Sequence, residues 1–542
     1  MISTATVRQG VLSKADGSAD DVATFRGIPF AEPPVGPLRW KSPVSPRSWA
    51  GTRPASEFGP VCVQHSPVPN SLYHPGVETQ SEDCLYLNVW TGAKAPGERR
   101  PVMVWFHLGA FIFGSGSQYA GSEGKRLFDG TKLARQGVVL VTVNYRLGRF
   151  GFLAHPWLSQ ESATGTSGNY GFMDQVAALR WVQENIAAFG GDPGCVTIFG
   201  VSAGSASVSL HMTSPLSKGL FHRAIGGSAG FFAPHGNGSG VYDRLLTQSA
   251  AEARGGAMAD ALRAKSLDAL RAAPAQDILN APLPGSASGP WFMDAVGASI
   301  GEGASDTCYP VVDGHAIPAP PGEIFAAGRQ NDVPLMTGST AKESTGLPGI
   351  ESLAEYTHYV QSEYGTLAGR CLETYPATDD VTAFASSGDM LGDRVFGWQN
   401  WTWARLARRT GSSPVYYYDW LHVAPRPAAR YAERVVGASH ASDMPFLFGN
   451  LAAFDWPWRA EDQALATIIG SYWVNFARSG NPNGAGLPAW PPFQDESGPA
   501  MQITRAPHAG APTRRQRFDF LDAYYGQMAA SPAANVTARV GR

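Results

Sequence analysis

Short apolar runs alternate with stretches of helical periodicity through the first 230 residues of the chain. Residues 102–106, 138–143 and 196–199 are brief apolar runs, as expected of buried strands. Residues 172–188, between the second and third runs, carry apolar side chains at helical spacing, and residues 203–210 predict a helix of small side chains. This alternation predicts an α/β fold with a large, mostly parallel central sheet.

The rest of the chain shows no linker, internal repeat or low-complexity boundary. Three further strands and one strongly amphipathic helix are predicted, at residues 224–226, 333–336, 415–418 and 465–476. We therefore expect residues 1–542 to form a single domain. Within it, residues of about 231–330 and 345–412 are expected to be mainly inserted helices and loops, and residues 528–542 a frayed tail.

Charge and hydropathy exclude several classes of protein. The net charge is −3 and the sequence pI about 6.5, so the chain lacks the basic footprint of a nucleic-acid-binding protein. The most apolar stretch, residues 101–113, contains His107 and falls short of the roughly 20 residues that span a membrane. Residues 1–20 lack the basic and apolar regions of a signal peptide, so no leader is visible.

The five cysteines are too few for a disulfide scaffold. Cys62 and Cys84 flank a loop rich in Pro, Ser and His that one bridge could close, whereas the pairing of Cys195, Cys308 and Cys371 stays open. The sequence contains no C-x-x-C pair and no His/Cys cluster of the kind that would suggest a metal site. We therefore expect neither a metal nor a cofactor.

A G-x-S-x-G motif at residues 200–204 provides the first chemical signal. A nucleophilic serine requires a tight turn from strand to helix, and flanking glycines let the backbone crowd there without Cβ clashes. The same pattern occurs at residues 226–230. Ser202 follows a predicted strand and precedes a predicted helix, whereas Phe231, Phe232 and Pro234 after Ser228 begin no clean helix. Context therefore favours Ser202.

A serine nucleophile also needs a base, a carboxylate that orients the base, and N–H donors for the oxyanion. Glu343 follows a predicted strand and turn, and His440 lies in a small-residue segment, but Asp419 and His422 fit the same requirements. Residues 107–110, directly after a predicted strand, have the position and part of the composition of an oxyanion loop.

Several sequence blocks then carry a resemblance to a known family. They lie at residues 25–31, 33–36, 81–88, 144–148, 168–204 and 472–483. Together these blocks resemble the carboxylesterase/cholinesterase family (type-B carboxylesterases), over about residues 5–525. The resemblance implies an α/β-hydrolase fold, with one catalytic domain and helical insertions over an active-site gorge.

The resemblance also implies roles for individual residues of this sequence. It implies a nucleophile, a base and an acid, three oxyanion N–H donors, a serine near the triad, and a first disulfide: Ser202, His440 and Glu343; Gly109, Ala110 and Ala203; Ser228; and Cys62 with Cys84. Two matching pairs are expected to be structural ion pairs, Arg39 with Glu82 and Arg146 with Asp174.

The chain departs from the family pattern close to the expected site. Val201 replaces the usual Glu before the nucleophile, and no Trp lies between Cys62 and Cys84, so a cationic choline ester is disfavoured. Leu108 and Ala110 carry side chains where the family has glycines, which disfavours bulky acyl groups and tertiary alcohols. Asp443 stands where many members have Glu.

The sequence as a whole predicts a serine hydrolase that cleaves small-molecule carboxylic esters through an acyl-enzyme. Two alternatives are a specialised esterase, lipase or amidase for a bulky substrate, and a non-catalytic cholinesterase-like binding or adhesion protein. A monomer or a dimer is expected. A Cys62–Cys84 bridge would favour a secreted or periplasmic location, and its absence a cytoplasmic one.

Overall fold

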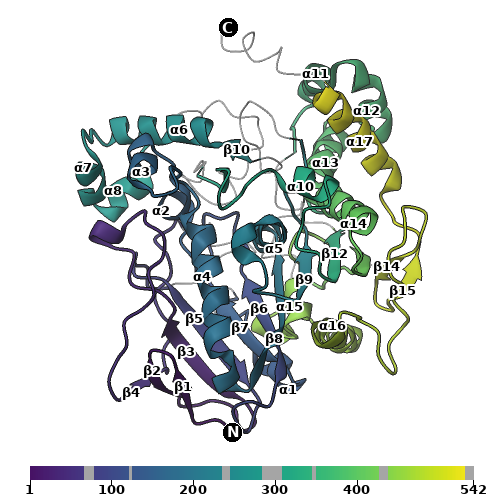
Figure 1. Cartoon of the computed structure of the whole chain (residues 1–542). Helices are drawn as coiled ribbons and strands as arrows, with labels where there is room; N and C mark the ends of the chain where they lie inside the picture. Colours follow the sequence, from purple (N-terminus) through teal and green to yellow (C-terminus); the bar gives the residue numbers. More distant parts are fainter. Residues whose placement is uncertain are drawn as a thin grey trace.

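A central mixed sheet organises the structure, a computed structural model in which residues 1–65, 78–120, 125–234, 245–282, 308–344, 349–426 and 437–530 are described (Figure 1). In order across the sheet, its ten strands are β15 (His508–Gly510), β14 (Ala500–Ile503), β13 (Val415–Trp420), β12 (Leu335–Thr340), β9 (Arg223–Gly227), β8 (Gly191–Val201), β6 (Arg100–Phe106), β7 (Val139–Val143), β5 (Tyr86–Thr91) and β3 (Ala23–Pro29). The neighbouring strands from β14 to β7 pair in parallel, and the pairs at both edges are antiparallel. The predicted α/β fold with a mostly parallel sheet is confirmed.

Side chains alternate between two cores on the central strands. On β6, Val102, Val104 and Phe106 enter one core, whereas Met103 and Trp105 enter the other. This alternation follows from the two-residue period of a strand, and both faces are apolar because helices cover both. The first core is closed by α4 (Tyr170–Asn185) and α14 (Trp398–Thr410), and the second by α16 (Ala460–Ser479).

The other elements of the described chain are short strands and helices. A small sheet holds β1 (Thr4–Val7), β2 (Gly10–Ser13) and β4 (Thr52–Pro54), and β10 (Leu246–Thr247) pairs with β11 (Val311–Val312). The α-helices not yet named are α1 (Thr131–Arg135), α2 (Gly148–Phe152), α3 (Pro156–Glu161), α5 (Ala203–Thr213), α6 (Gln248–Ala261), α7 (Leu267–Ala272), α8 (Ala275–Asn280), α10 (Pro321–Ala326), α11 (Leu353–Tyr364), α12 (Ala368–Thr374), α13 (Asp380–Gly392), α15 (Met444–Leu447) and α17 (Arg515–Ala530). In Figure 1, α6–α8 lie at the upper left and α11–α13 with α17 at the upper right, on either side of the top of the sheet.

The structure describes only part of the predicted tail and only parts of the predicted insertions. Helix α17 continues to Ala530, past the predicted start of the tail at residue 528, and residues 531–542 lie outside the described residues. Parts of the expected insertions, at residues 235–244, 283–307 and 345–348, also lie outside them.

Two strands of the sheet, β3 and β5, carried no clear sequence signal because polar residues interrupt them. The amide of Asn88 on β5 accepts a hydrogen bond from the N–H of Gly27 at 3.0 Å and donates one to Thr142 Oγ1 at 3.0 Å. Gly27 sits in a break of register between β3 and β5 with a φ of +61°. The buried side chain of Asn88 therefore accepts a backbone N–H that the pairing of β3 with β5 leaves without a partner.

The predicted Cys62–Cys84 disulfide is wrong for this structure. Both residues are free thiols buried in the first core. The neighbouring Cys62 thiol and burial raise the pKa of Cys84, so the thiolate that disulfide chemistry requires is disfavoured. The Cys62 sulfur also accepts a hydrogen bond from the N–H of Leu147 at 3.3 Å, which joins it to the segment after β7.

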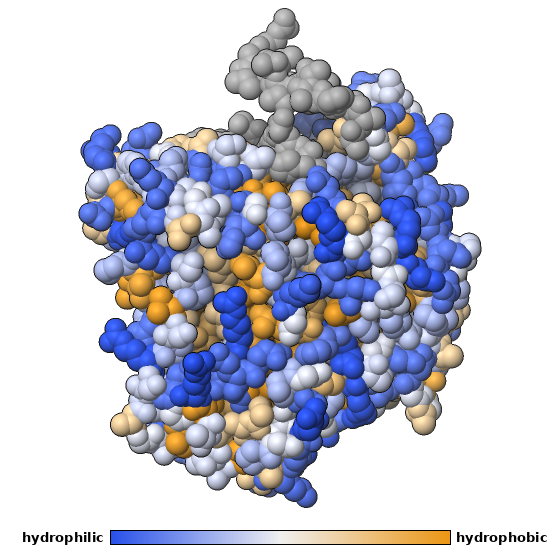
Figure 2. All heavy atoms as spheres, in the orientation of Figure 1, coloured by the Kyte–Doolittle hydropathy of each residue, from blue (hydrophilic) through white to orange (hydrophobic). Residues whose placement is uncertain are grey.

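Within the described part of the chain, no helix has both the length and the apolar character needed to cross a bilayer. Figure 2 shows hydrophilic side chains over most of one face of the molecule, with hydrophobic side chains gathered towards its middle.

Both expected structural ion pairs are present. Arg146 Nη2 lies 2.7 Å from Asp174 Oδ1, with 3% and 0% of the two side chains exposed, and Arg39 Nη2 lies 2.5 Å from Glu82 Oε1. Arg146 also donates through its backbone N–H to Asp174, so this pair joins the segment after β7 to α4. Loss of one partner would leave an uncompensated buried charge.

We predict that Asp174→Ala lowers the free energy of unfolding by about 3–5 kcal/mol, because it leaves the Arg146 guanidinium buried without its carboxylate. Urea titration followed by tryptophan fluorescence measures the change. Asp21→Ala is the control, because its pair with Arg135 is 57% and 50% exposed, and it should leave the urea midpoint unchanged. Equal effects of the two substitutions would contradict the prediction.

Candidate active site

Ser202 occupies a strained turn between β8 and α5. Its φ of +59° and ψ of −126° are unusual for a residue with a side chain. A Cβ on Gly200 would lie 2.3 Å from the carbonyl carbon of Gly204, and a Cβ on Gly204 would lie 2.0 Å from the oxygen of Phe106. Both glycines of the motif are therefore required by close backbone contacts, as expected of a nucleophile elbow.

Ser228, in the second G-x-S-x-G motif, is placed differently. It follows β9 with a φ of +55°, is fully buried, and is followed by irregular chain rather than a helix. Its hydroxyl is buried and has no hydrogen-bond partner in the described part of the chain. Because the N–H of Ser202 donates to the carbonyl of the neighbouring Gly227, Ser228 lies close behind the first turn but does not present its hydroxyl to solvent.

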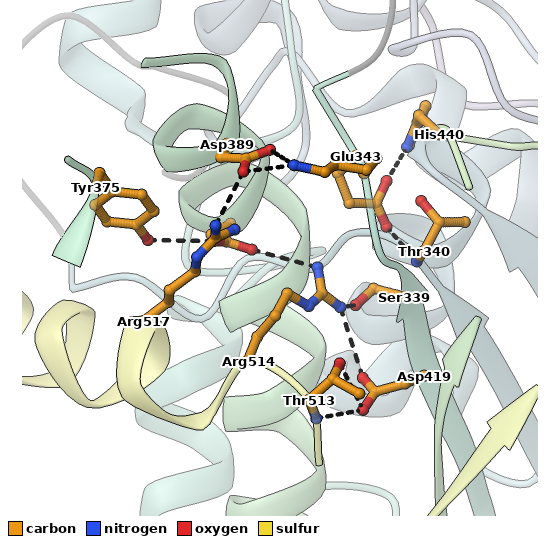
Figure 3. Close-up of polar contacts among 12 residues, drawn as sticks. Ser339, Thr340, Glu343, Tyr375, Asp389, Asp419, His440, Thr513, Arg514 and Arg517 are labelled. Atoms are coloured by element: carbon orange, nitrogen blue, oxygen red, sulfur yellow. Dashed lines mark hydrogen bonds and ion pairs between the residues drawn. The ribbon is translucent and has the colours of Figure 1, made fainter. Parts of the chain in front are cut away.

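Glu343 and His440 come together near the end of β12 (Figure 3). The Oε2 atom of Glu343 lies 2.5 Å from Nδ1 of His440, and its Oε1 atom accepts the N–H of Thr340 at 2.7 Å. The backbone N–H of Lys342 donates to the carbonyl of Ala438 and links the two segments. This arrangement orients the imidazole ring and leaves Nε2 as the nitrogen that could exchange a proton with a nucleophile.

The structure gives different partners to Asp419 and His422, the alternative acid and base that the sequence allowed. Asp419 accepts hydrogen bonds from the N–H and hydroxyl of Thr513, at 2.8 and 3.1 Å. His422 Nε2 lies 2.7 Å from Asp462 Oδ1, at the start of α16. Asp419 and His422 are therefore engaged with different partners, and neither joins the Glu343–His440 pair.

The loop after β6 passes beside the turn at Ser202. Gly109, Ala110 and Phe111 have φ values of +117°, +51° and +60°, and a Cβ on Gly109 would lie 1.9 Å from the oxygen of Phe113. Within the described residues, no group accepts a hydrogen bond from the N–H of Gly109 or Ala110. Two unpaired N–H groups next to a strained serine are what an oxyanion site requires.

His107, in the same loop, is held in a structural role. Burial lowers its pKa to about 4, so the ring is neutral at ordinary pH. It stacks on Tyr145 with 4.3 Å between ring centroids, and the Tyr145 hydroxyl donates to the His107 carbonyl at 3.0 Å. These contacts fix the loop where it leaves β6.

The segment that carries His440 reaches the ends of β8 and β9. An ideal Cβ on Gly227 would lie 3.6 Å from Cγ2 of Val201 and 3.8 Å from Oδ2 of Asp443. The Ser202 hydroxyl makes no hydrogen bond to the described chain. Catalytic hydrogen bonds are often long without substrate and shorten when substrate binds.

Comparisons with known proteins show which family the chain belongs to. The description of the Carboxylesterase family matches residues 2–521. The chain is 35% identical to a fumonisin B1 esterase of Sphingopyxis macrogoltabida over 90% of this chain and 84% of that protein. It is 33% identical to a human cocaine esterase, over 94% and 89% of the two chains. The chain belongs to the carboxylesterase family.

Solved structures of esterases have the same fold. A PNB esterase structure superposes with a TM-score of 0.76 at 31% identity, covering 96% of this chain and 100% of that one. A carboxylesterase of Geobacillus stearothermophilus gives a TM-score of 0.75 at 33% identity, covering 96% and 99%. This carboxylesterase therefore has an α/β-hydrolase fold and is a carboxylic-ester hydrolase.

The departures from the family pattern have definite places in this carboxylesterase. Leu108 is buried in the second core and lines a small cavity beside His440, together with Arg426 and Trp456. The Arg426 guanidinium stands 5.5 Å from the centre of the Trp456 ring. Ala110 is half-buried and has a φ of +51°.

Asp443 is a second buried carboxylate next to the Glu343–His440 pair. Neither of its carboxylate oxygens has a hydrogen-bond partner among the residues that the structure describes. Burial, and then the charge of Glu343, raise the pKa of Asp443 to about 7, against the opposing effect of His440. Between about pH 4 and pH 7 the folded protein thus holds a proton that the unfolded chain has lost. Asp443 therefore makes the fold less stable as the pH rises through this window.

We predict that the stability of Asp443→Asn, relative to the unsubstituted protein, rises by about 1.4 kcal/mol per pH unit between pH 4 and 7 and is constant above pH 7. The neutral amide replaces a group that costs free energy only when it ionises. Urea unfolding at pH 5, 6, 7 and 8 measures the difference. A difference independent of pH would show that Asp443 is ionised throughout this range.

The sequence carries no signal for Phe396, which contacts the Glu343–His440 pair. Phe396 packs on the His440 ring with 4.1 Å between ring centroids and 31° between the ring planes. Phe396 lies just after α13, within residues 345–412, which the sequence predicted to be mainly inserted helices and loops. Only the tertiary contact identifies it. The described residues hold no group of three or more His, Cys, Asp or Glu side chains that could bind a metal ion.

Proposed function

We propose that this carboxylesterase hydrolyses esters through a triad of Ser202, His440 and Glu343. The contact of 2.5 Å between Glu343 Oε2 and His440 Nδ1 carries the proposal, because it orients a base near a strained serine. In the first half-reaction, His440 Nε2 takes the hydroxyl proton as Ser202 attacks the ester carbonyl. The protonated imidazole then gives this proton to the leaving alcohol.

The oxyanion of each tetrahedral intermediate is assigned to the N–H groups of Gly109, Ala110 and Ala203. Water then attacks the acyl-enzyme, again with His440 as the base, and releases the acid and the serine. Glu343 keeps the proton of the neutral ring on Nδ1 and stabilises the imidazolium. Ser228 and Asp443 are assigned no proton transfer, because both are buried behind the turn.

The substrate class follows from what borders the site. The relatives are named for different esters, so family membership assigns the reaction rather than one substrate. Val201 is neutral, where the family pattern has a Glu before the nucleophile. The loss of that negative charge supports a preference for neutral over cationic alcohols, because a carboxylate at this position would attract a quaternary ammonium group.

The triad is tested by mapping a fluorophosphonate adduct with mass spectrometry. We expect a stoichiometric adduct on Ser202, and we expect Ser202→Ala, His440→Gln and Glu343→Gln each to lower kcat on 4-nitrophenyl butyrate by about 10⁴-fold or more. His422→Gln is the matched control, because His422 makes a similar buried contact with Asp462, and it should leave kcat within about threefold.

Two outcomes would overturn the assignment. An adduct on Ser228 would show that the second motif carries the nucleophile. A folded protein that neither reacts nor hydrolyses 4-nitrophenyl butyrate would favour a binding protein over an enzyme.

The methyl group of Ala110 should restrict the alcohol. Ala110 adopts a φ of +51° at the edge of the oxyanion loop, so Ala110→Gly removes both the methyl group and a conformation that favours glycine. We predict that this substitution raises the ratio of kcat/KM for tert-butyl acetate over n-butyl acetate by about tenfold. Parallel titration of acetic acid release from the two esters gives the ratio. An unchanged ratio would show that Ala110 does not border the alcohol site.

A further inference from the structure

A π-helical turn, Asp393–Gly397, interrupts one long helix beside the candidate site. It follows α13 directly and continues into α14, and the N–H of Trp398 donates to the carbonyl of Asp393, five residues earlier. Inside the turn, the Gln399 side-chain amide donates to the Arg394 carbonyl at 3.1 Å, which satisfies a group in the widened backbone. Such turns are rare, and they occur frequently at functional sites.

The start of the turn rests on the segment that carries Glu343. A Cβ on Gly392 would lie 2.7 Å from the N atom of Ser344 and 3.0 Å from Cβ of Glu343. One turn earlier on α13, a Cβ on Gly388 would make only ordinary contacts, 3.4 Å from Cβ and Oγ of Ser344. The helix therefore touches the acid most closely where the π-helical turn begins.

The end of the turn rests on the base. Phe396 covers the His440 ring, with 4.1 Å between ring centroids. Immediately after the turn, Asn400 fixes α14 to the sheet: its Nδ2 donates to Thr337 Oγ1 at 2.8 Å, and its Oδ1 accepts the N–H of Ala229 at 2.9 Å. Positions 392, 396 and 400 thus lie against Glu343, the His440 ring and the sheet, respectively.

The outer side of the turn is anchored by charge (Figure 3). Asp393 is buried, and its two oxygens lie 3.3 Å from Arg514 Nη1 and 3.3 Å from Arg517 Nη1. Arg517 also pairs with Asp389 at 3.0 Å, and Asp389 pairs with Lys342, next to Glu343, at 2.7 Å. This chain of alternating charges holds the turn between the segment leading into α17 and the segment of the acid.

We propose that the π-helical turn is a positioning element, which sets the geometry of the Glu343–His440 pair through Gly392 on one partner and Phe396 on the other. The proposal rests on the triad of the proposed function. In this view Phe396 is a positioning residue that limits rotation of the imidazole, and Asp393 fixes the turn from the far side. A base held in this way delivers its Nε2 atom to Ser202 without a search over ring orientations, and small misplacements of such groups cost up to about 10²-fold in rate.

The first test compares two substitutions on the same helix. Gly392→Ala and Gly388→Ala make the same chemical change in α13, but only the first presses on Glu343. We expect Gly392→Ala to lower kcat on 4-nitrophenyl butyrate by about tenfold with KM within about twofold, and Gly388→Ala to leave both unchanged. Equal kinetic effects of the two would overturn the proposal for the acid.

The second test concerns the base, and it stands even if Gly392→Ala fails to fold. Phe396→Leu keeps an apolar side chain but removes the ring, whereas Phe396→Tyr keeps the ring. We expect Phe396→Leu to lower kcat, and the rate of Ser202 phosphonylation by a small fluorophosphonate, by about tenfold, and Phe396→Tyr to restore both to within about twofold. Equal thermal unfolding midpoints of the two variants would exclude a loss of fold as the cause.

The outcomes separate this proposal from the proposed function. A rise in KM with kcat unchanged in Phe396→Leu would make Phe396 a substrate contact and overturn the positioning role. Unchanged kcat and phosphonylation would overturn it as well. An unsubstituted protein that forms no Ser202 adduct would instead contradict the triad itself, whatever the variants do.

Discussion

The geometry of the site depends on the close approach of backbone to backbone at the first turn of α5. Gly204 packs against the carbonyl of Phe106 at the end of β6, and Gly200 packs against Gly204 within the turn. No residue with a Cβ fits either place, so β6, β8 and α5 meet only because both side chains are absent. This meeting holds Ser202 in its unusual conformation and brings the loop after β6, which we propose binds the oxyanion, to the start of α5. The strain is local, but the two cores of the sheet maintain it.

Buried charge is the second constraint on the site. Three buried carboxylates lie in this region, and they differ in how many partners they have. Glu343 is satisfied by His440 and by a backbone N–H, and Asp393 by two arginines. Asp443, equally buried, has no hydrogen-bond partner for either oxygen among the described residues, and burial and then the charge of Glu343 raise its pKa to about 7. Two negative charges close together in a buried place are unfavourable, so Asp443 keeps its proton to a higher pH than an exposed carboxyl group does.

Much of the fold could be predicted from the sequence, because its central strands are continuous apolar runs. The predicted strand at residues 196–199 is the centre of β8, and the helix predicted at 172–188 corresponds to α4 and the short 3₁₀ turn that follows it. Strands β3 and β5 were missed because Asn88 and a break of register interrupt the apolar pattern. The disulfide was carried over from family resemblance, and the structure has two free thiols in its place.

The sequence by itself determined the family, the sheet and the serine turn, because these depend on residues close together along the chain. Strand and helix periods, and glycines spaced around one serine, are local patterns. Local patterns did not choose among the acids and histidines, because Asp419 and His422 satisfied the same criteria as Glu343 and His440, and only the family resemblance favoured the second pair. The tertiary structure alone shows the contact itself, between two residues that are 97 positions apart. It also decided that Phe396 covers the imidazole. Such contacts depend on how the helices after β12 pack against the sheet, and no short stretch of sequence encodes that packing.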